Sequence, residues 1–232
     1  SLQLGSQPPL SLYVHLPWCL KKCPYCDFNS HGLQGELPEA EYSAALLADL
    51  QQSLPLIWGR RVESIFFGGG TPSLFSPEAL ATLISQFRAL LPLSPMCEIT
   101  LEANPGTFER ERFAAFAQAG VTRLSIGVQS FHDRYLQVLG RVHDRAQALA
   151  AVEEAARSFA TFNLDLMHGL PEQSIEDALS DLRTAIAQGP THLSWYQLTV
   201  EPNTVFWNQP PEVPEDDILW DIQEAGQALL AA

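Results

Sequence analysis

Short apolar segments alternate along this chain with longer segments whose apolar residues recur at helical spacing. Alternation of this kind is typical of βα units, in which helices connect neighbouring parallel strands. The segments between the short runs are predicted to be helices, so the predicted fold class is α/β. The pattern predicts six β-strands, at Leu12–His15, Ser64–Phe67, Glu98–Glu102, Leu124–Val128, Phe162–Met167 and Leu193–Gln197.

The predicted strands also alternate in polarity. Successive side chains of a strand point to opposite faces of the sheet, so one face is apolar and should pack on helices. A closed eight-stranded barrel fills its interior with bulky aliphatic side chains. A polar inner face instead predicts an open, partial (β/α)6 barrel of the TIM type that encloses a polar ligand. The alternative is a sheet with one face in solvent. The polar or small positions of three strands are Glu98, Thr100, Glu102, Ser125, Gly127, Gln129, Asn163 and Asp165.

Local signals mark several helix boundaries. Ser76 stands before a proline, a typical N-cap with proline at the first helical position. Ser174 followed by Asp177 resembles a capping box. Both signals predict that a helix starts directly after the serine.

The end of the chain departs from the βα pattern. A proline-rich stretch, 210–214, precedes a last predicted helix, Glu215–Leu230. We therefore expect the partial barrel to occupy residues 1–210. Residues 211–232 are expected to be a linker and the beginning of a C-terminal segment that is truncated here.

Composition excludes several classes of function. The chain has 232 residues with 13 basic and 27 acidic side chains, for a formal net charge of −14. This balance argues against a nucleic-acid-binding protein, which needs a basic surface to contact phosphates, and against adhesion to anionic membranes. No apolar run has the length of a membrane span, and the N-terminus lacks a signal-peptide pattern. We therefore expect a cytoplasmic protein without stable membrane insertion.

Three of the four cysteines form one compact motif, Cys19-x-x-x-Cys23-x-x-Cys26. A chance match to this spacing is expected about once in a thousand such chains. Soft thiolates select zinc, copper(I) or iron–sulfur clusters. A [4Fe–4S] cluster usually takes four cysteines, so three would leave one iron open to a further ligand. The fourth cysteine, Cys97, is expected to be a small buried residue.

The main alternative for the cysteines is a zinc site. His15 or His31 would then be the fourth ligand. A structural zinc site usually draws its ligands from two separate knuckles. The single tight cysteine loop therefore favours the cluster.

Four further motifs accompany the cysteines: YVHLP at Tyr13–Pro17, GGGTP at Gly68–Pro72, EANPG at Glu102–Gly106 and GVQSF at Gly127–Phe131. Together with the cysteine motif they resemble the coproporphyrinogen-oxidase-like branch of the radical S-adenosylmethionine (SAM) proteins, from about Ser11 to Pro202. In that family the open iron of the cluster chelates SAM, and the reduced cluster passes an electron to its sulfonium group. The resemblance implies that the chain binds a [4Fe–4S] cluster and SAM.

Two departures from the oxidase narrow the resemblance to the heme-chaperone members of this branch. The oxidase has a further cysteine where this chain has Phe28, and an N-terminal extension where this chain has a short stub. The implied function is to bind heme and pass it to acceptor hemoproteins. The alternative is an oxygen-independent coproporphyrinogen III oxidase, so whether the chain is an enzyme stays open. The chaperone-like segments are Cys26–His31, Asn163–Pro171 and Leu193–Thr199.

The resemblance implies a role for individual residues. Nearly all of them end or follow a predicted strand, at the face where barrel active sites assemble. The implied cluster ligands are Cys19, Cys23 and Cys26. The implied SAM contacts are Tyr13, Tyr25, Gly69, Gly70, Thr71, Glu102, Gln129, Arg141, Asp165 and Thr199.

Overall fold

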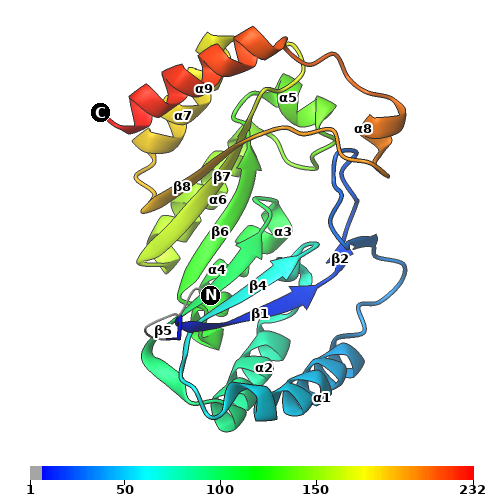
Figure 1. Ribbon diagram of the computed structural model, residues 1–232, viewed down its shortest axis with the longest axis vertical. Coiled ribbons are helices and arrows are strands. Elements are labelled where there is room, and N and C mark those ends of the chain that lie inside the picture. The colour runs from blue at the N-terminus through cyan, green and yellow to red at the C-terminus, as the bar shows by residue number, and fades with distance from the viewer. Residues whose placement is uncertain (1–6) are drawn as a thin grey trace, which may run out of the picture.

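The computed structural model describes residues 7–232 and confirms an open α/β barrel. Within this range one parallel sheet has the strand order β1-β4-β5-β6-β7-β8 (Figure 1). The edge strands β1 and β8 do not pair with each other, so the barrel stays open between them. All six predicted strand segments lie inside these strands. Their bounds are β1 Leu10–Leu16, β4 Val62–Gly69, β5 Leu93–Ala103, β6 Arg123–Gln129, β7 Thr161–His168 and β8 His192–Gln197.

Helices connect the strands and cover the outer face of the sheet (Figure 1). In the described part of the chain, none of them has both the length and the apolar character needed to cross a bilayer. A short 3-10 turn, η1 (Pro72–Leu74), follows β4. The helices are α1 Glu39–Ile57, α2 Pro77–Leu90, α3 Thr107–Arg110, α4 Phe113–Ala119, α5 Asp133–Val138, α6 Arg145–Ser158, α7 Ile175–Ala187, α8 Val205–Asn208 and α9 Asp216–Leu230.

The core lies between the sheet and the helices, as the alternation predicts. Ile99 and Leu101 of β5, with Leu124 of β6, are completely buried. They belong to one cluster with Phe113 and Phe116 of α4. Burying a side chain of this size contributes about 1.5–3 kcal/mol each. The opposite face of the strands is therefore free to carry polar groups.

Both predicted capping serines are confirmed. The Ser76 side chain accepts a hydrogen bond from the Ala79 backbone N–H, and α2 starts at the proline that follows Ser76. Ser174 and Asp177 form a reciprocal capping box at the start of α7. The predicted last helix is confirmed as α9, which begins one residue after Glu215.

The sequence pattern does not reveal the smallest elements. Strands β2 (Trp18–Cys19) and β3 (His31–Gly32) form a two-residue parallel pair that closes the cysteine loop. Helix α8 has four residues. Elements this short carry no periodicity that a pattern can detect.

Helix α9 lies along α7 at the end of the sheet (Figure 1). The contact to the sheet depends on Gly226, where an added Cβ would lie 1.9 Å from the Trp195 ring of β8. The glycine therefore permits a close approach that a larger residue would prevent. The division of the chain at residue 210 stays a prediction, and the first six residues of the expected barrel domain lie outside the described range.

Candidate functional site

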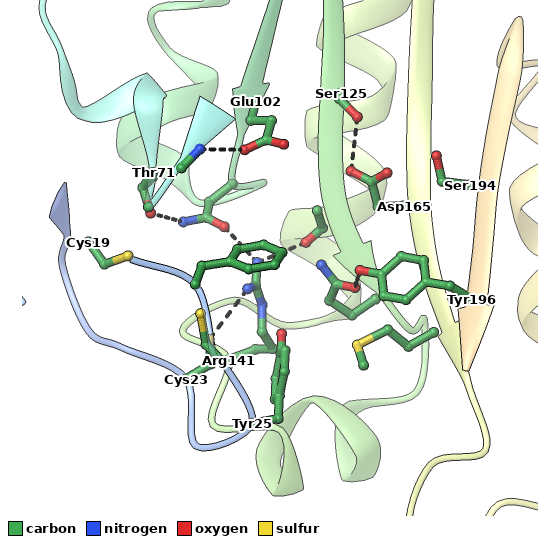
Figure 2. Close-up of a pocket in the computed structure, with 18 of the residues that line it drawn as sticks. Cys19, Cys23, Tyr25, Thr71, Glu102, Ser125, Arg141, Asp165, Ser194 and Tyr196 are labelled. Carbon is green, nitrogen blue, oxygen red and sulfur yellow. Dashed lines mark hydrogen bonds between the residues drawn. The ribbon is translucent and has the colours of Figure 1, made fainter. Parts of the chain in front are cut away.

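A cavity of about 700 Å³ opens on the polar side of the sheet. This volume is within the usual range for a small-molecule site. The polar face therefore encloses a pocket and is not simply a solvated surface. Every residue predicted to contact the cluster or SAM lines this cavity except Tyr13 (Figure 2).

The cysteine loop forms one wall of the pocket. Its ends are held together by the β2–β3 pair, in which Cys19 is opposite Gly32. The Cys26 N–H donates to the Cys23 carbonyl at 3.1 Å, which makes a tight turn. All three thiols are free, and Cys97 is buried elsewhere, as expected. The loop thus presents three unpaired sulfur ligands to one cavity.

The environment of the thiols fits a metal cluster. Burial raises the pKa of the Cys19 thiol, and hydrogen bonds with Thr71 and Ser30 lower it in part. The Arg141 guanidinium donates from Nη1 to Cys23 Sγ at 3.6 Å. A positive group beside a sulfur favours the thiolate, and a bound metal removes the thiol proton outright. The donor set is therefore suited to iron.

The two histidines that could complete a zinc site, His15 and His31, are both engaged in hydrogen bonds in this structure. His15 pairs through Nδ1 with Tyr13 Oη at 2.9 Å and through Nε2 with the Asn29 carbonyl at 2.8 Å. His31 Nε2 pairs with Asn29 Oδ1 at 3.0 Å. Between residues 7 and 232, no three His, Cys, Asp or Glu side chains converge as a single ion requires. A four-iron cluster binds each thiolate at a different iron, so its ligands need not converge.

The glycine motif after β4 forms a backbone cradle at the pocket. Gly69 has φ 128°, and an added Cβ would lie 2.8 Å from the Leu16 carbonyl oxygen. At Gly70 a Cβ would lie 2.6 Å from the Trp18 carbonyl oxygen. Only glycine tolerates both the conformation and the contacts. The cradle brings backbone polar groups to the cavity wall, where a polar ligand fits.

Glu102 lies beside this cradle at the end of β5. Its Oε2 accepts a hydrogen bond from the Gly69 N–H at 3.2 Å. Burial raises the pKa of Glu102 to about 7, although the bond from Gly69 opposes the shift. A buried carboxylate with one donor favours a cationic ligand group, because such a group would offset its desolvation.

Asp165 lies across the pocket on β7 and is held by polar neighbours (Figure 2). Ser125 Oγ donates to its Oδ2 at 3.0 Å, and Asn163 Nδ2 donates to its Oδ1 at 2.8 Å. Burial still raises the pKa of Asp165. The carboxylate is thus fixed in direction and has capacity for further donors.

Arg141 joins the remaining parts of the site. Its Nη2 donates to Asn104 Oδ1 at 2.6 Å and to the Gly127 carbonyl at 2.9 Å. Gln129, at the end of β6, has φ 67° and accepts a hydrogen bond from Tyr196 Oη at 2.8 Å. The thiol loop, β5, β6 and β8 are therefore connected by hydrogen bonds around one cavity.

Tyr13 is the one predicted contact that does not line the cavity. Its side chain is 58% exposed on β1, and its ring stacks near Phe66 with centroids 6.4 Å apart. Desolvation raises the pKa of the Tyr13 phenol, and Glu102 adds to the shift by electrostatic repulsion. Its role in SAM binding stays a prediction.

Several pocket residues were not predicted as contacts. Ser125, Asn163 and Ser194 are on the polar face of their strands, so the alternation itself was the signal that could have found them. Asn104 lies in the EANPG motif and Tyr196 in the segment Leu193–Thr199, so the motifs that carry the family resemblance were the signal for these two. The additional polar residues at the cavity wall are Lys21, Asp27, Asn104, Arg123, Ser125, Asn163, Ser194, Tyr196, Gln197 and Glu201.

A family comparison agrees with this geometry. The model of the Radical SAM superfamily matches residues 13–183, which include the thiol loop, the glycine cradle, Glu102 and Asp165. The chain belongs to the radical SAM superfamily. Membership implies a [4Fe–4S] cluster and SAM as cofactors, and the residues described above fit both groups.

Individual relatives refine the comparison. The heme chaperone HemW of Escherichia coli is 57% identical over 226 residues, which are 97% of this chain and 60% of the relative. HemW of Haemophilus influenzae is 55% identical, with 96% and 60% covered. This chain therefore spans about 60% of the length of these relatives. Among solved structures, coproporphyrinogen III oxidase (HemN) from Escherichia coli has a TM-score of 0.85 and 29% identity, covering 96% of this chain and 52% of its own.

Proposed function

We propose that this chain is the cofactor-binding part of a heme chaperone, which binds heme and passes it to acceptor hemoproteins. The observation that carries the proposal is the 57% identity to HemW over 97% of the chain. The cytoplasmic location expected from composition remains a prediction.

The proposal assigns Cys19, Cys23 and Cys26 as cluster ligands. A bound cluster of this type supplies one-electron reduction and an open iron that chelates SAM. The thiol loop presents its sulfurs to the cavity, and Arg141 donates to one of them. Tyr25 covers the same wall, and burial raises the pKa of its phenol. The tyrosine is therefore neutral beside the thiol loop.

The SAM contacts follow from the chemistry of each group. Glu102, beside the Gly69 N–H, would accept a hydrogen bond from the amino group of SAM. Asp165, oriented by Ser125 and Asn163, is placed to accept hydrogen bonds from ribose hydroxyls. The remaining proposed contacts line the same cavity, and they are Gly70, Thr71, Gln129 and Thr199.

The second candidate function is oxygen-independent coproporphyrinogen III oxidation. The fold match to HemN at a TM-score of 0.85 favours it. The identity to that enzyme is 29%, about half of the identity to HemW. Both candidates require the cluster and SAM, so they differ in what happens to the porphyrin.

One experiment separates the two. The chain is reconstituted anaerobically with iron and sulfide, titrated with heme by absorbance, and mixed with apomyoglobin as an acceptor. Heme loaded on serum albumin serves as the passive-transfer control. The chaperone function predicts binding of heme and faster transfer from this chain than from albumin. Conversion of coproporphyrinogen III to protoporphyrinogen IX with SAM and a reductant would instead support the oxidase.

A further inference from the structure

Phe28 is an exposed aromatic side chain on the cysteine loop. Its side chain is 63% exposed, and it also lines the cavity. A phenylalanine left in water forgoes the favourable burial of its ring. A single exposed apolar side chain is common on protein surfaces, but this one also lines a pocket, where ligand contacts are mainly apolar and aromatic.

The backbone around Phe28 is held firmly. The Phe28 carbonyl accepts hydrogen bonds from the Ser30 N–H at 2.7 Å and from Lys22 Nζ at 3.0 Å. The carbonyl of the next residue, Asn29, pairs with His15 Nε2 at 2.8 Å. The His31 N–H donates to the Pro17 carbonyl at 2.8 Å, which fixes the segment to the end of β1. The loop thus presents the ring on a fixed support, which lowers the entropy cost of a stacking contact.

This position is also linked to the thiols. Ser30 is 1% exposed, and its Oγ lies 3.5 Å from Cys26 Sγ and 3.4 Å from the Phe28 carbonyl. Phe28 is therefore close in sequence to the proposed cluster ligand Cys26 and is linked to it through Ser30. A ligand that stacked on it would lie at the thiol side of the pocket.

The pocket contains apolar surface that the proposed SAM contacts leave unused. Phe66, Met167 and Leu198 line the same cavity as Phe28, and their side chains carry no oxygen or nitrogen for a hydrogen bond. Apolar and aromatic walls with a few polar groups are typical of sites for flat hydrophobic ligands. Both the adenine of SAM and the heme macrocycle have a planar π-face. The macrocycle is the larger and more apolar face, which suits a ring that is mostly open to solvent.

We propose that Phe28 is a stacking residue for the planar face of heme at the mouth of the pocket. This inference rests on the proposed function, because it names the group that holds the heme. Aromatic pairs prefer offset-stacked or edge-to-face contacts and contribute beyond the area they bury. Phe28 then contacts the ligand directly and takes part in neither cluster ligation nor SAM binding.

The test compares four reconstituted proteins: the unaltered chain, Phe28→Ala, Phe28→Trp and Leu20→Ala. Leu20 is a matched control, because it is in the same loop, is 54% exposed and does not line the cavity. Heme affinity is measured by absorbance titration, SAM affinity by anaerobic calorimetry and cluster content by iron analysis. Phe28→Ala should weaken heme binding about five- to tenfold, whereas Phe28→Trp and Leu20→Ala should stay within about twofold. SAM affinity and iron content should not change.

Each contrary outcome has a separate meaning. Unchanged heme affinity in Phe28→Ala overturns this inference alone. A loss of SAM affinity in that variant would show that the ring stacks on adenine, and an equal loss of heme affinity in Leu20→Ala would show a nonspecific surface effect. If the unaltered chain binds no heme, the proposed function fails and this inference fails with it.

Discussion

The ionisation of Glu102 should control how tightly the reconstituted chain binds SAM. Burial raises the pKa of this carboxyl to about 7, and the Gly69 N–H at 3.2 Å is its hydrogen-bond donor. The ionised carboxylate is the better acceptor for the amino group of SAM and also attracts its cationic sulfonium, so affinity should rise as pH rises through this value. With a pKa of about 7, about one molecule in eleven is ionised at pH 6 and about ten in eleven at pH 8. The dissociation constant should therefore be about tenfold larger at pH 6.

The Glu102→Gln variant isolates this effect. The α-amino group of SAM itself titrates near pH 8, at about 7.7–8.0 for a model amine, and contributes equally in both proteins. Anaerobic calorimetry at pH 6, 7 and 8 gives the affinity, and buffers of different ionisation enthalpy give the protons released. The glutamine variant should bind SAM more weakly than the unaltered protein at pH 8. Its dissociation constant should also lack the tenfold difference between pH 6 and pH 8 that Glu102 causes. If both proteins show the same ratio between pH 6 and pH 8, the reasoning about Glu102 is refuted.

Three further predictions concern the cluster, the core and α9. Cys23→Ala should reduce the iron retained after reconstitution to background without changing the circular dichroism, because the ligand loop is at the surface; iron at the unaltered level would contradict the assignment. Phe116→Ala, at a completely buried position, should lower the free energy of unfolding in urea by about 3–5 kcal/mol, and a loss below about 1 kcal/mol would argue against a tightly packed core. Gly226→Ala should make α9 exchange amide hydrogens faster, since the new Cβ would meet the Trp195 ring at 1.9 Å; unchanged exchange would show that the ring can move aside.

The strands could be predicted because each buries one face. Alternation places Ile99, Leu101 and Leu124 in the core, and all three are completely buried. The same rule places Glu102 and Asp165 on the pocket side, where both line the cavity. The predicted strand at Glu98 was shorter than β5, which begins at Leu93. The missing part contains Pro95, and the pairing with β4 shifts register there, so the alternating signal is lost.

The conformation of Gln129 could not be predicted, because it depends on residues far away in the chain. Gln129 adopts φ 67° at a register shift between β6 and β7. The turn after it is held by Asp181 of α7, which accepts from Ser130 Oγ at 2.6 Å and from the Phe131 N–H at 2.7 Å. Asp181 is 1% exposed and about fifty positions away in sequence. Local propensity favours neither a left-handed glutamine nor a buried aspartate, so only the folded chain reveals the pair.

The polar interior of the barrel links ligand recognition to stability. The pKa of Glu102 rises from 4.5 to about 7 on folding, so the folded chain binds more protons than the unfolded chain in this window. The free energy of unfolding of the unliganded protein therefore falls as pH rises from about 4.5 to about 7, by about 3 kcal/mol for this group. Aliphatic side chains in place of the polar interior, as in a closed barrel, would avoid this loss of stability. They would also remove the buried negative charge that attracts a cationic ligand most strongly where water is excluded. Bound SAM stabilises the folded state by mass action, so the instability of the empty site and its affinity for SAM have the same origin, the desolvation of Glu102.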